Sequence, residues 1–194
     1  FSFPLIAFSF FATLFMYAYA RWFAAPARLI ANTSQLTNWK EKNELLYLAS
    51  GILGAAGAIY FAFQLNKATL FWVLICGGIS ALYPLQFLQR GKQGLRNVAG
   101  LKLFVISAVW AIVTTILPAM QSNLAFSFEL GFLTVQRFLF VMAITIPFDI
   151  RDLRIDSPNI NTLPYTLGVK TARRVALFAL FLAEMGAVVL CFNN

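Results

Sequence analysis

Three aspartates in the last third of the chain have the residue type and spacing for metal chemistry. Asp149, Asp152 and Asp156 are all of its aspartates and three of its seven acidic residues. Their offsets of i, i+3 and i+7 amount to about 300° and 700° of helical rotation, so on a helix the carboxylates would share one stripe. Like charges on one stripe repel each other unless a cation lies between them. The spacing therefore indicates a cation site.

The rest of the composition narrows the kind of cation and the chemistry. The chain has no histidine, which excludes His-metal centres and Ser-His or Cys-His nucleophiles. Oxygen ligands favour Mg²⁺. A basic cluster, Lys170, Arg173 and Arg174, follows the aspartates closely. Carboxylate-bound Mg²⁺ next to cations that neutralise phosphate oxygens is what diphosphate chemistry requires.

The same residues also allow a purely structural interpretation. Arg151 and Arg154 alternate with the aspartates, so the acidic residues could solvate an interfacial helix. The basic cluster could equally serve to set membrane topology. From the residues alone, both interpretations stay open.

The elements that must position these residues are membrane spans. The chain is 60% hydrophobic and 11% charged, with a mean hydropathy of +0.76, which places it in the membrane class. Six apolar segments are long enough to cross a bilayer. We predict an all-α polytopic bundle, a single membrane domain that is part of a larger bundle, with spans near residues 1–20, 44–65, 68–88, 98–120, 124–146 and 175–192.

The loops between the spans differ in charge. Residues 21–43, 89–97 and 147–174 together hold twelve Lys and Arg residues, whereas the two short connections between spans hold one. The positive-inside rule places the basic loops in the cytoplasm. We expect an integral protein of a bacterial inner membrane with its aspartate loop cytoplasmic. The division of the basic residues among loops also argues against nucleic-acid binding.

Local patterns predict what surrounds the aspartates. Pro147 suits the first turn of a helix, which would place Asp149 in that turn, where the positive helix end favours a carboxylate. In the second span, Gly51, Gly54 and Gly57 predict close helix packing and not a phosphate loop.

Several polar residues fall inside or near the predicted spans. Arg137 is near mid-membrane and must face the bundle interior or water. It could approach a diphosphate or pair with a carboxylate on another helix, for which Glu184 is a candidate. Glu129 is too far along the same span for a direct pair. Asn97 and Lys102 are candidate residues at the mouth of a cytoplasmic cavity.

The sequence Pro147-Phe-Asp-Ile-Arg-Asp-Leu-Arg-Ile-Asp156 resembles the second aspartate motif of the UbiA-type membrane prenyltransferase superfamily. Tyr83-Pro84 and the basic loop Arg90–Arg96, which is followed by Lys102 and Trp110, resemble the middle of the same fold. The resemblance implies a helical bundle around a cavity that opens to the membrane. It also implies that Asp149, Asp152 and Asp156 bind Mg²⁺ and a prenyl diphosphate, whose prenyl chain passes to a hydrophobic acceptor.

The chain departs from the family pattern in two places. The family's first aspartate motif should follow the first span, but that place reads Tyr17-Ala-Tyr-Ala-Arg21-Trp22, with no acidic residue before Glu41. The family's tyrosine-to-lysine spacing is also lost, because Phe87 stands four residues after Tyr83. Half of the expected carboxylate set is therefore missing.

Three functional hypotheses follow. The first is an intramembrane prenyltransferase in which Mg²⁺ binds the aspartates, and the diphosphate is neutralised by Arg151, Lys170, Arg173 and Arg174. The second is a catalytically inactive subunit or lipid-binding scaffold of the same fold, whose aspartates pair with arginines or with a partner membrane subunit. The third, a transporter, is the least supported: its best evidence is Glu129 and Arg137, and the candidate for a broken helix is near Pro118, close to a span end.

Overall fold

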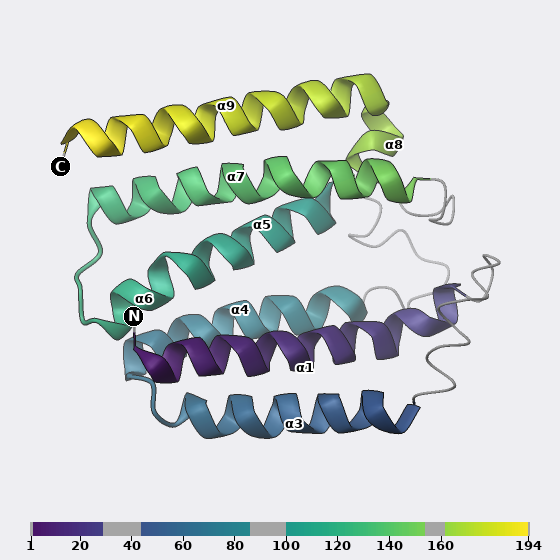
Figure 1. The fold of residues 1–194 in the computed structure, drawn as a ribbon, viewed down its shortest axis with the longest axis vertical. Coiled ribbons are helices and arrows are strands. Elements are labelled where there is room, and N and C mark those ends of the chain that lie inside the picture. Colours follow the sequence, from purple (N-terminus) through teal and green to yellow (C-terminus); the bar gives the residue numbers. More distant parts are fainter. Residues whose placement is uncertain (1, 29–43, 86–99, 154–161, 194) are drawn as a thin grey trace. The chain divides into compact units, whose positions relative to one another are not determined.

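The computed structural model describes residues 2–28, 44–85, 100–153 and 162–193. These residues are almost entirely helical and contain no strand, which confirms the predicted all-α class. They belong to two compact units, Phe1–Lys92 and Gln93–Asn194 (Figure 1). Each unit is described here by itself.

The first unit contains the helices α1 (Phe3–Arg28), α3 (Glu44–Ala62) and α4 (Lys67–Leu85). Helix α1 packs along α3 and, over a smaller area, against α4. The start of α4 is capped by Asn66, whose side-chain oxygen accepts a hydrogen bond of 2.8 Å from the backbone N–H of Thr69. Such a cap satisfies one of the free N–H groups of the first turn.

Glycines let α1 and α3 approach each other closely. A Cβ on Gly54 would lie 2.7 Å from the backbone nitrogen of Phe15, and one on Gly57 would overlap the ring of Phe11. Gly51 faces Ala18 in the same way. Small residues at a helix interface permit this kind of packing in a membrane, so the packing role predicted for the three glycines is confirmed.

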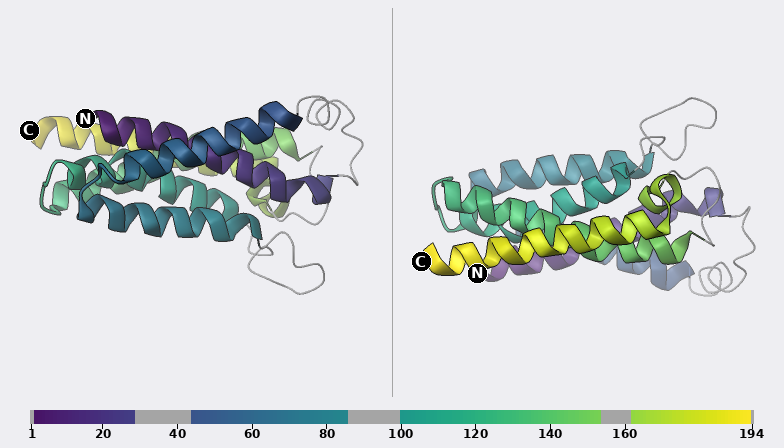
Figure 2. Two further views of the ribbon diagram at one scale, coloured as in Figure 1. Left: turned by 90° about the horizontal axis from the view of Figure 1, so that it is seen from below. Right: turned by 90° about the horizontal axis from the view of Figure 1, so that it is seen from above.

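The second unit is built around α7 (Phe128–Asp152), with α5 (Leu101–Thr114) on one side and α9 (Val169–Asn193) on the other (Figures 1 and 2). The short helix α6 (Ile116–Gln121) follows α5, and α8 (Leu163–Leu167) precedes α9. Helix α9 returns antiparallel to α7, because α8 turns the chain back at the end of α7 that carries Asp152.

Small side chains form the contact between α7 and α9. Ala172, Ala179, Ala183 and Gly186 of α9 are all buried. A Cβ on Gly186 would lie 3.2 Å from Cγ of Gln136 on α7. Their spacing of seven, four and three residues is that of a coiled-coil seam, so α9 presents one continuous narrow stripe to α7.

The fourth predicted span is divided into α5 and α6 at Thr115, whose φ of −124° and ψ of −61° are not helical. Pro118 explains the break, because it has no N–H for the carbonyl four residues earlier and its ring crowds that carbonyl. The Thr115 hydroxyl lies 2.7 Å from the carbonyl of Ala111 and 2.9 Å from the hydroxyl of Thr134. A side-chain hydrogen bond therefore joins the break to α7.

The prediction that a helix begins at Pro147 is wrong. Helix α7 begins after Ser127, whose hydroxyl accepts a hydrogen bond from the backbone N–H of Leu130, and it runs through Pro147 to Asp152. Proline is tolerated inside membrane helices when neighbouring groups satisfy the freed carbonyl. Asp149 consequently lies in the last turn of α7 and not in the first turn of a new helix.

The predicted loop 147–174 is largely helical where it is described. It contains the end of α7, all of α8, and the first turns of α9, which begins at Val169. Gly168, between α8 and α9, has a φ of +79°, a conformation that residues with a Cβ rarely adopt.

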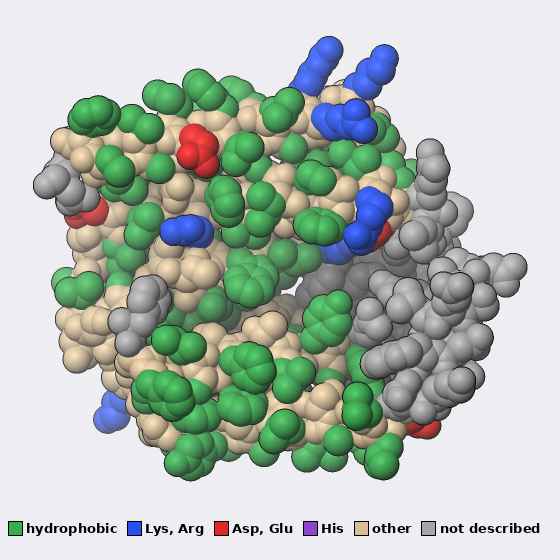
Figure 3. All heavy atoms as spheres, viewed as in Figure 1, with side chains coloured by type: hydrophobic (Ala, Val, Ile, Leu, Met, Phe, Trp, Pro, Cys, Tyr) green, Lys and Arg blue, Asp and Glu red, His purple; other side chains and the backbone are tan. Residues whose placement is uncertain are grey.

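Five described helices are long and apolar enough to cross a membrane: Phe3–Ala20, Glu44–Ala62, Leu101–Gln121, Phe128–Asp152 and Val169–Phe192. The sixth predicted span corresponds to α4, whose described apolar stretch, Lys67–Ala81, is shorter. Hydrophobic side chains are spread over the described surface visible in Figure 3, with few charged side chains among them. The chain is therefore consistent with an integral membrane protein, while the count of six spans stays a prediction.

Candidate functional site

The end of the second unit that carries the aspartates also holds a buried ion pair. Asp149, in the last turn of α7, lies with its Oδ1 3.0 Å from Nζ of Lys102, the second residue of α5. The Asp149 side chain is 3% exposed and the Lys102 side chain 36%. The carboxylate is thus enclosed, while the ammonium group reaches it from the edge.

An apolar cluster lies next to this ion pair. Leu103 of α5, Ile146 of α7 and Ala172 of α9 are buried against one another. Each of the first two lies close in sequence to one partner of the ion pair. The cluster thereby fixes the two helix ends that present Lys102 and Asp149 to each other.

The start of α5 has its own conformational requirement. Gly100 precedes α5 with a φ of +82°, and a Cβ there would lie 3.4 Å from Cδ1 of Leu163 on α8. Glycine adopts this backbone conformation without the steric cost that other residues incur. The turn at Gly100 sets the direction from which Lys102 enters the site.

Electrostatics at this end favour a cationic partner for Asp149. The last turn of a helix carries a partial negative charge, and burial removes water from the carboxylate; a nearby cation offsets both of these costs. In the described part of the chain, Lys102 is the ion-pair partner that compensates for them. Removing one member of such a pair leaves a buried charge and costs about 3–5 kcal/mol.

Asp152 has a different partner and a different environment. Its Oδ1 lies 2.8 Å from Nε of the neighbouring Arg151. The two side chains are 30% and 68% exposed, and the Arg151 guanidinium lies over the ring of Phe148 at 5.3 Å from its centroid. An exposed pair of this kind contributes little to stability, about 0–1 kcal/mol. Asp152 is therefore free to exchange its partner for another cation.

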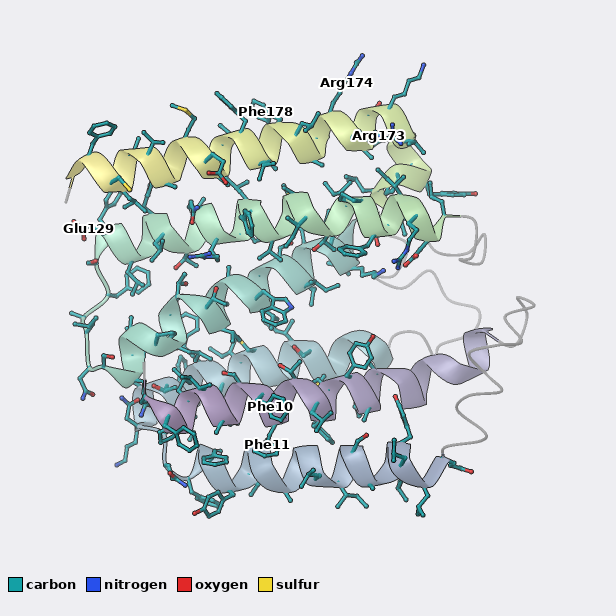
Figure 4. The ribbon with its side chains drawn as sticks, in the orientation of Figure 1. Phe10, Phe11, Glu129, Arg173, Arg174 and Phe178 are labelled. Atoms are coloured by element: carbon teal, nitrogen blue, oxygen red, sulfur yellow. The ribbon has the colours of Figure 1, made fainter. Side chains whose placement is uncertain are left out.

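The basic residues at the start of α9 are not gathered onto Asp149. Lys170, Arg173 and Arg174 are exposed, and Arg174 points away from α7 in Figure 4. They form no ion pair with a described residue. They are exposed charges at the start of α9, whereas Lys102, predicted as a residue of the cavity mouth, makes the direct contact with Asp149.

Other predicted site residues lie elsewhere or are not described. Asp156 and Asn97 are outside the described residues. Arg137 is twelve residues before Asp149 on α7, about 18 Å along the helix axis, so the two do not share a site. Glu129, at the first turn of α7, lies at the opposite end of that helix (Figure 4).

The described residues supply an incomplete set of metal ligands. No group of three or more Asp, Glu, Cys or His side chains comes together among them. Asp149 and Asp152 would offer two carboxylates at one helix end, and the predicted third, Asp156, is outside the described part. Oxygen ligands of this type fit Mg²⁺, provided that Asp149 exchanges Lys102 for the metal.

Sequence reasoning identified both members of the buried pair but not their contact. They are 47 residues apart in the chain, and nothing in the local pattern of either helix connects them. A usable signal was present, because Lys102 stands alone at the start of a long apolar span and a cation there needs a nearby anion.

Comparison with protein-family models, curated proteins and solved structures finds no match to this chain. The resemblance to the UbiA-type superfamily therefore stays a prediction from the aspartate motif.

Proposed function

We propose that this chain is a UbiA-like intramembrane transferase, which moves a prenyl group from a polyprenyl diphosphate to a lipid-soluble acceptor. The supporting observation is the enclosed Asp149 carboxylate, held by Lys102 at the same end of the second unit at which Asp152 lies and the basic start of α9 begins. A carboxylate and several cations at one helix end, above an apolar cluster, suit a ligand with an anionic head and a hydrocarbon tail.

In this proposal each residue has a defined role. Asp149, Asp152 and Asp156 would hold Mg²⁺, which supplies charge stabilisation of the diphosphate leaving group. Lys102, released from Asp149, turns toward the phosphate oxygens. The remaining neutralising cations are Arg151, Lys170, Arg173 and Arg174. The acceptor approaches from the lipid, and the site faces the cytoplasm of a bacterial inner membrane.

Binding measurements test this assignment directly. We expect the purified chain to bind a prenyl diphosphate only with Mg²⁺ present, and we expect Asp149→Ala combined with Asp152→Ala to weaken that binding by at least about a hundredfold, because two ligands are lost. The matched control is Glu129→Gln, which changes a carboxylate at the other end of α7. Unchanged Mg²⁺-dependent binding by the double variant would contradict the proposal.

A second function is favoured by the ion pairs themselves. Both described aspartates already have cationic partners, Lys102 and Arg151, as a non-catalytic subunit or lipid-binding scaffold of the same fold would need. On this alternative the chain acts through partner membrane subunits. The same binding experiment distinguishes the two functions. If the chain is a scaffold, even the wild-type chain should show no Mg²⁺-dependent affinity for prenyl diphosphate.

A further inference from the structure

Two opposite charges lie at one depth in the second unit, far from the aspartate end. Arg137 is nine residues after the first residue of α7, and Glu184 is nine residues before the last residue of α9. Because the two helices are antiparallel, both residues lie about 13 Å from the same end of the unit. That depth is well inside the hydrocarbon region of a bilayer.

Neither charge has a partner in the described part of the chain. Nε of Arg137 is buried and forms no hydrogen bond with a described residue, while the side chain as a whole is half-buried. Glu184 is exposed, and the ion pairs of this unit join other residues. Unpaired charges at this depth are costly, and they almost always face a complementary group or a watery cavity.

The described helices of the first unit carry few charges. Its helices α3 and α4 are charged only at their first residues, Glu44 and Lys67, and α1 only in its last third, at Arg21 and Arg28. Among the described residues of the second unit, Arg137 and Glu184 are the charges that lie at this depth.

We propose that a second copy of this chain docks on the second unit, so that Arg137 of each copy pairs with Glu184 of the other. All copies enter the membrane with one orientation, so a two-fold axis must run along the membrane normal and preserve depth. Residues that pair across such an axis must therefore lie at equal depth, as these two do.

The surroundings of Glu184 suit a helix-to-helix contact. Leu177, Phe181 and Val188 lie within about 60° of it around α9, and they are 67%, 60% and 46% exposed. The packed stripe of α9 toward α7 is on another side, at Ala183 and Gly186. An apolar face with one central carboxylate is complementary to a partner surface that has one cation among apolar side chains.

The decisive experiment mixes two charge-reversed chains in lipid bilayers. Differently labelled Arg137→Glu and Glu184→Arg chains are reconstituted alone and together, and dimers are counted by single-molecule co-localisation. Each variant alone repels itself, so we expect about tenfold fewer dimers than wild type for each. The mixture has two complementary pairs per heterodimer and should regain the wild-type dimer fraction.

Two further measurements keep the result interpretable if a reversed chain folds poorly. The neutral variants Arg137→Gln and Glu184→Gln should each lower the dimer fraction without repulsion. A single chain carrying both reversals should dimerise with itself. Wild-type chains that stay monomeric would overturn the proposal. It would also fail if the double-reversal chain recovers while the mixture does not, since the pair would then form within one copy.

Discussion

At the scale of single residues, the buried pair of Asp149 and Lys102 is the feature on which both proposed functions depend. An enclosed carboxylate at the negative end of a helix is unfavourable without a cation, and Lys102 supplies that cation at 3.0 Å. In a transferase the lysine would be a temporary partner that yields to metal and substrate. In a scaffold it would be the permanent one.

Exchanging the two charges separates stability from ligand binding. Lys102→Met should lower the stability of the chain by about 3 kcal/mol, because Asp149 is left buried and unpaired. The exchanged variant, Lys102→Glu with Asp149→Lys, should recover much of that loss in thermal unfolding in detergent. Arg151→Met is the control, since the exposed pair with Asp152 contributes under about 1 kcal/mol.

The exchanged variant also reports on function. If the chain is a transferase, recovered stability should not be accompanied by recovered Mg²⁺-dependent binding, because Asp149 would no longer be a ligand. Equal stability of Lys102→Met and wild type would show that the pair makes no contribution to the fold.

At the scale of elements, the sequence predicted which segments are helices better than it predicted where each helix begins and ends. Apolar runs and their length located five of the predicted spans. The small residues Gly51, Gly54 and Gly57 predicted close packing of α3 but not its partner, α1. The end of α7 could not be predicted in this way. The apolar run stops at Ile146 and Pro147 normally marks a helix start, yet α7 continues because Lys102, distant in sequence, allows Asp149 to be buried.

The break at Thr115 has a similar explanation. No charged residue follows Lys102 in the segment from α5 to α6, so hydropathy alone predicts one helix. The interruption depends on Pro118 and on a hydroxyl of α7, Thr134, that is close only in the folded chain. Local sequence patterns thus failed to predict the contacts between residues that are far apart in the chain, both in the fold and in the candidate site.

The α1–α3 interface makes a prediction at this scale. Gly54→Ala would place a Cβ 2.7 Å from the Phe15 backbone, and we expect it to destabilise the first unit by about 1–3 kcal/mol through overpacking. Gly77→Ala on α4 is the matched control, because no atom lies within 4 Å of the added Cβ. Thermal unfolding in detergent compares the two, and equal effects would contradict the interface.

At the scale of the whole molecule, the distribution of charge predicts the orientation in the membrane. In a Cys191→Ser background, a cysteine at Ser122 lies in the short connection after α6 and one at Lys170 lies at the start of α9. We expect a membrane-impermeant maleimide to label the first in intact cells and the second only after permeabilisation. The remaining native thiol, Cys76, is buried.

The reverse labelling pattern would place the aspartate end outside the cell. It would then be incompatible with a cytoplasmic site, whichever of the two functions the chain has. Labelling of both positions in intact cells would instead show that this segment does not cross the bilayer as predicted.

The length of α7 has a consequence for how the protein fits its membrane. At 25 residues, both α7 and α9 are about 37 Å long, whereas the hydrocarbon core is about 30 Å thick. Immersing either helix fully would require a tilt of nearly 40°, at the limit of what membrane helices adopt. At a more ordinary tilt, about a turn of each helix projects into the headgroup layer. The ends with Asp149, Asp152 and the basic start of α9 would then stand among lipid phosphates, where any anionic ligand must compete with the bilayer itself.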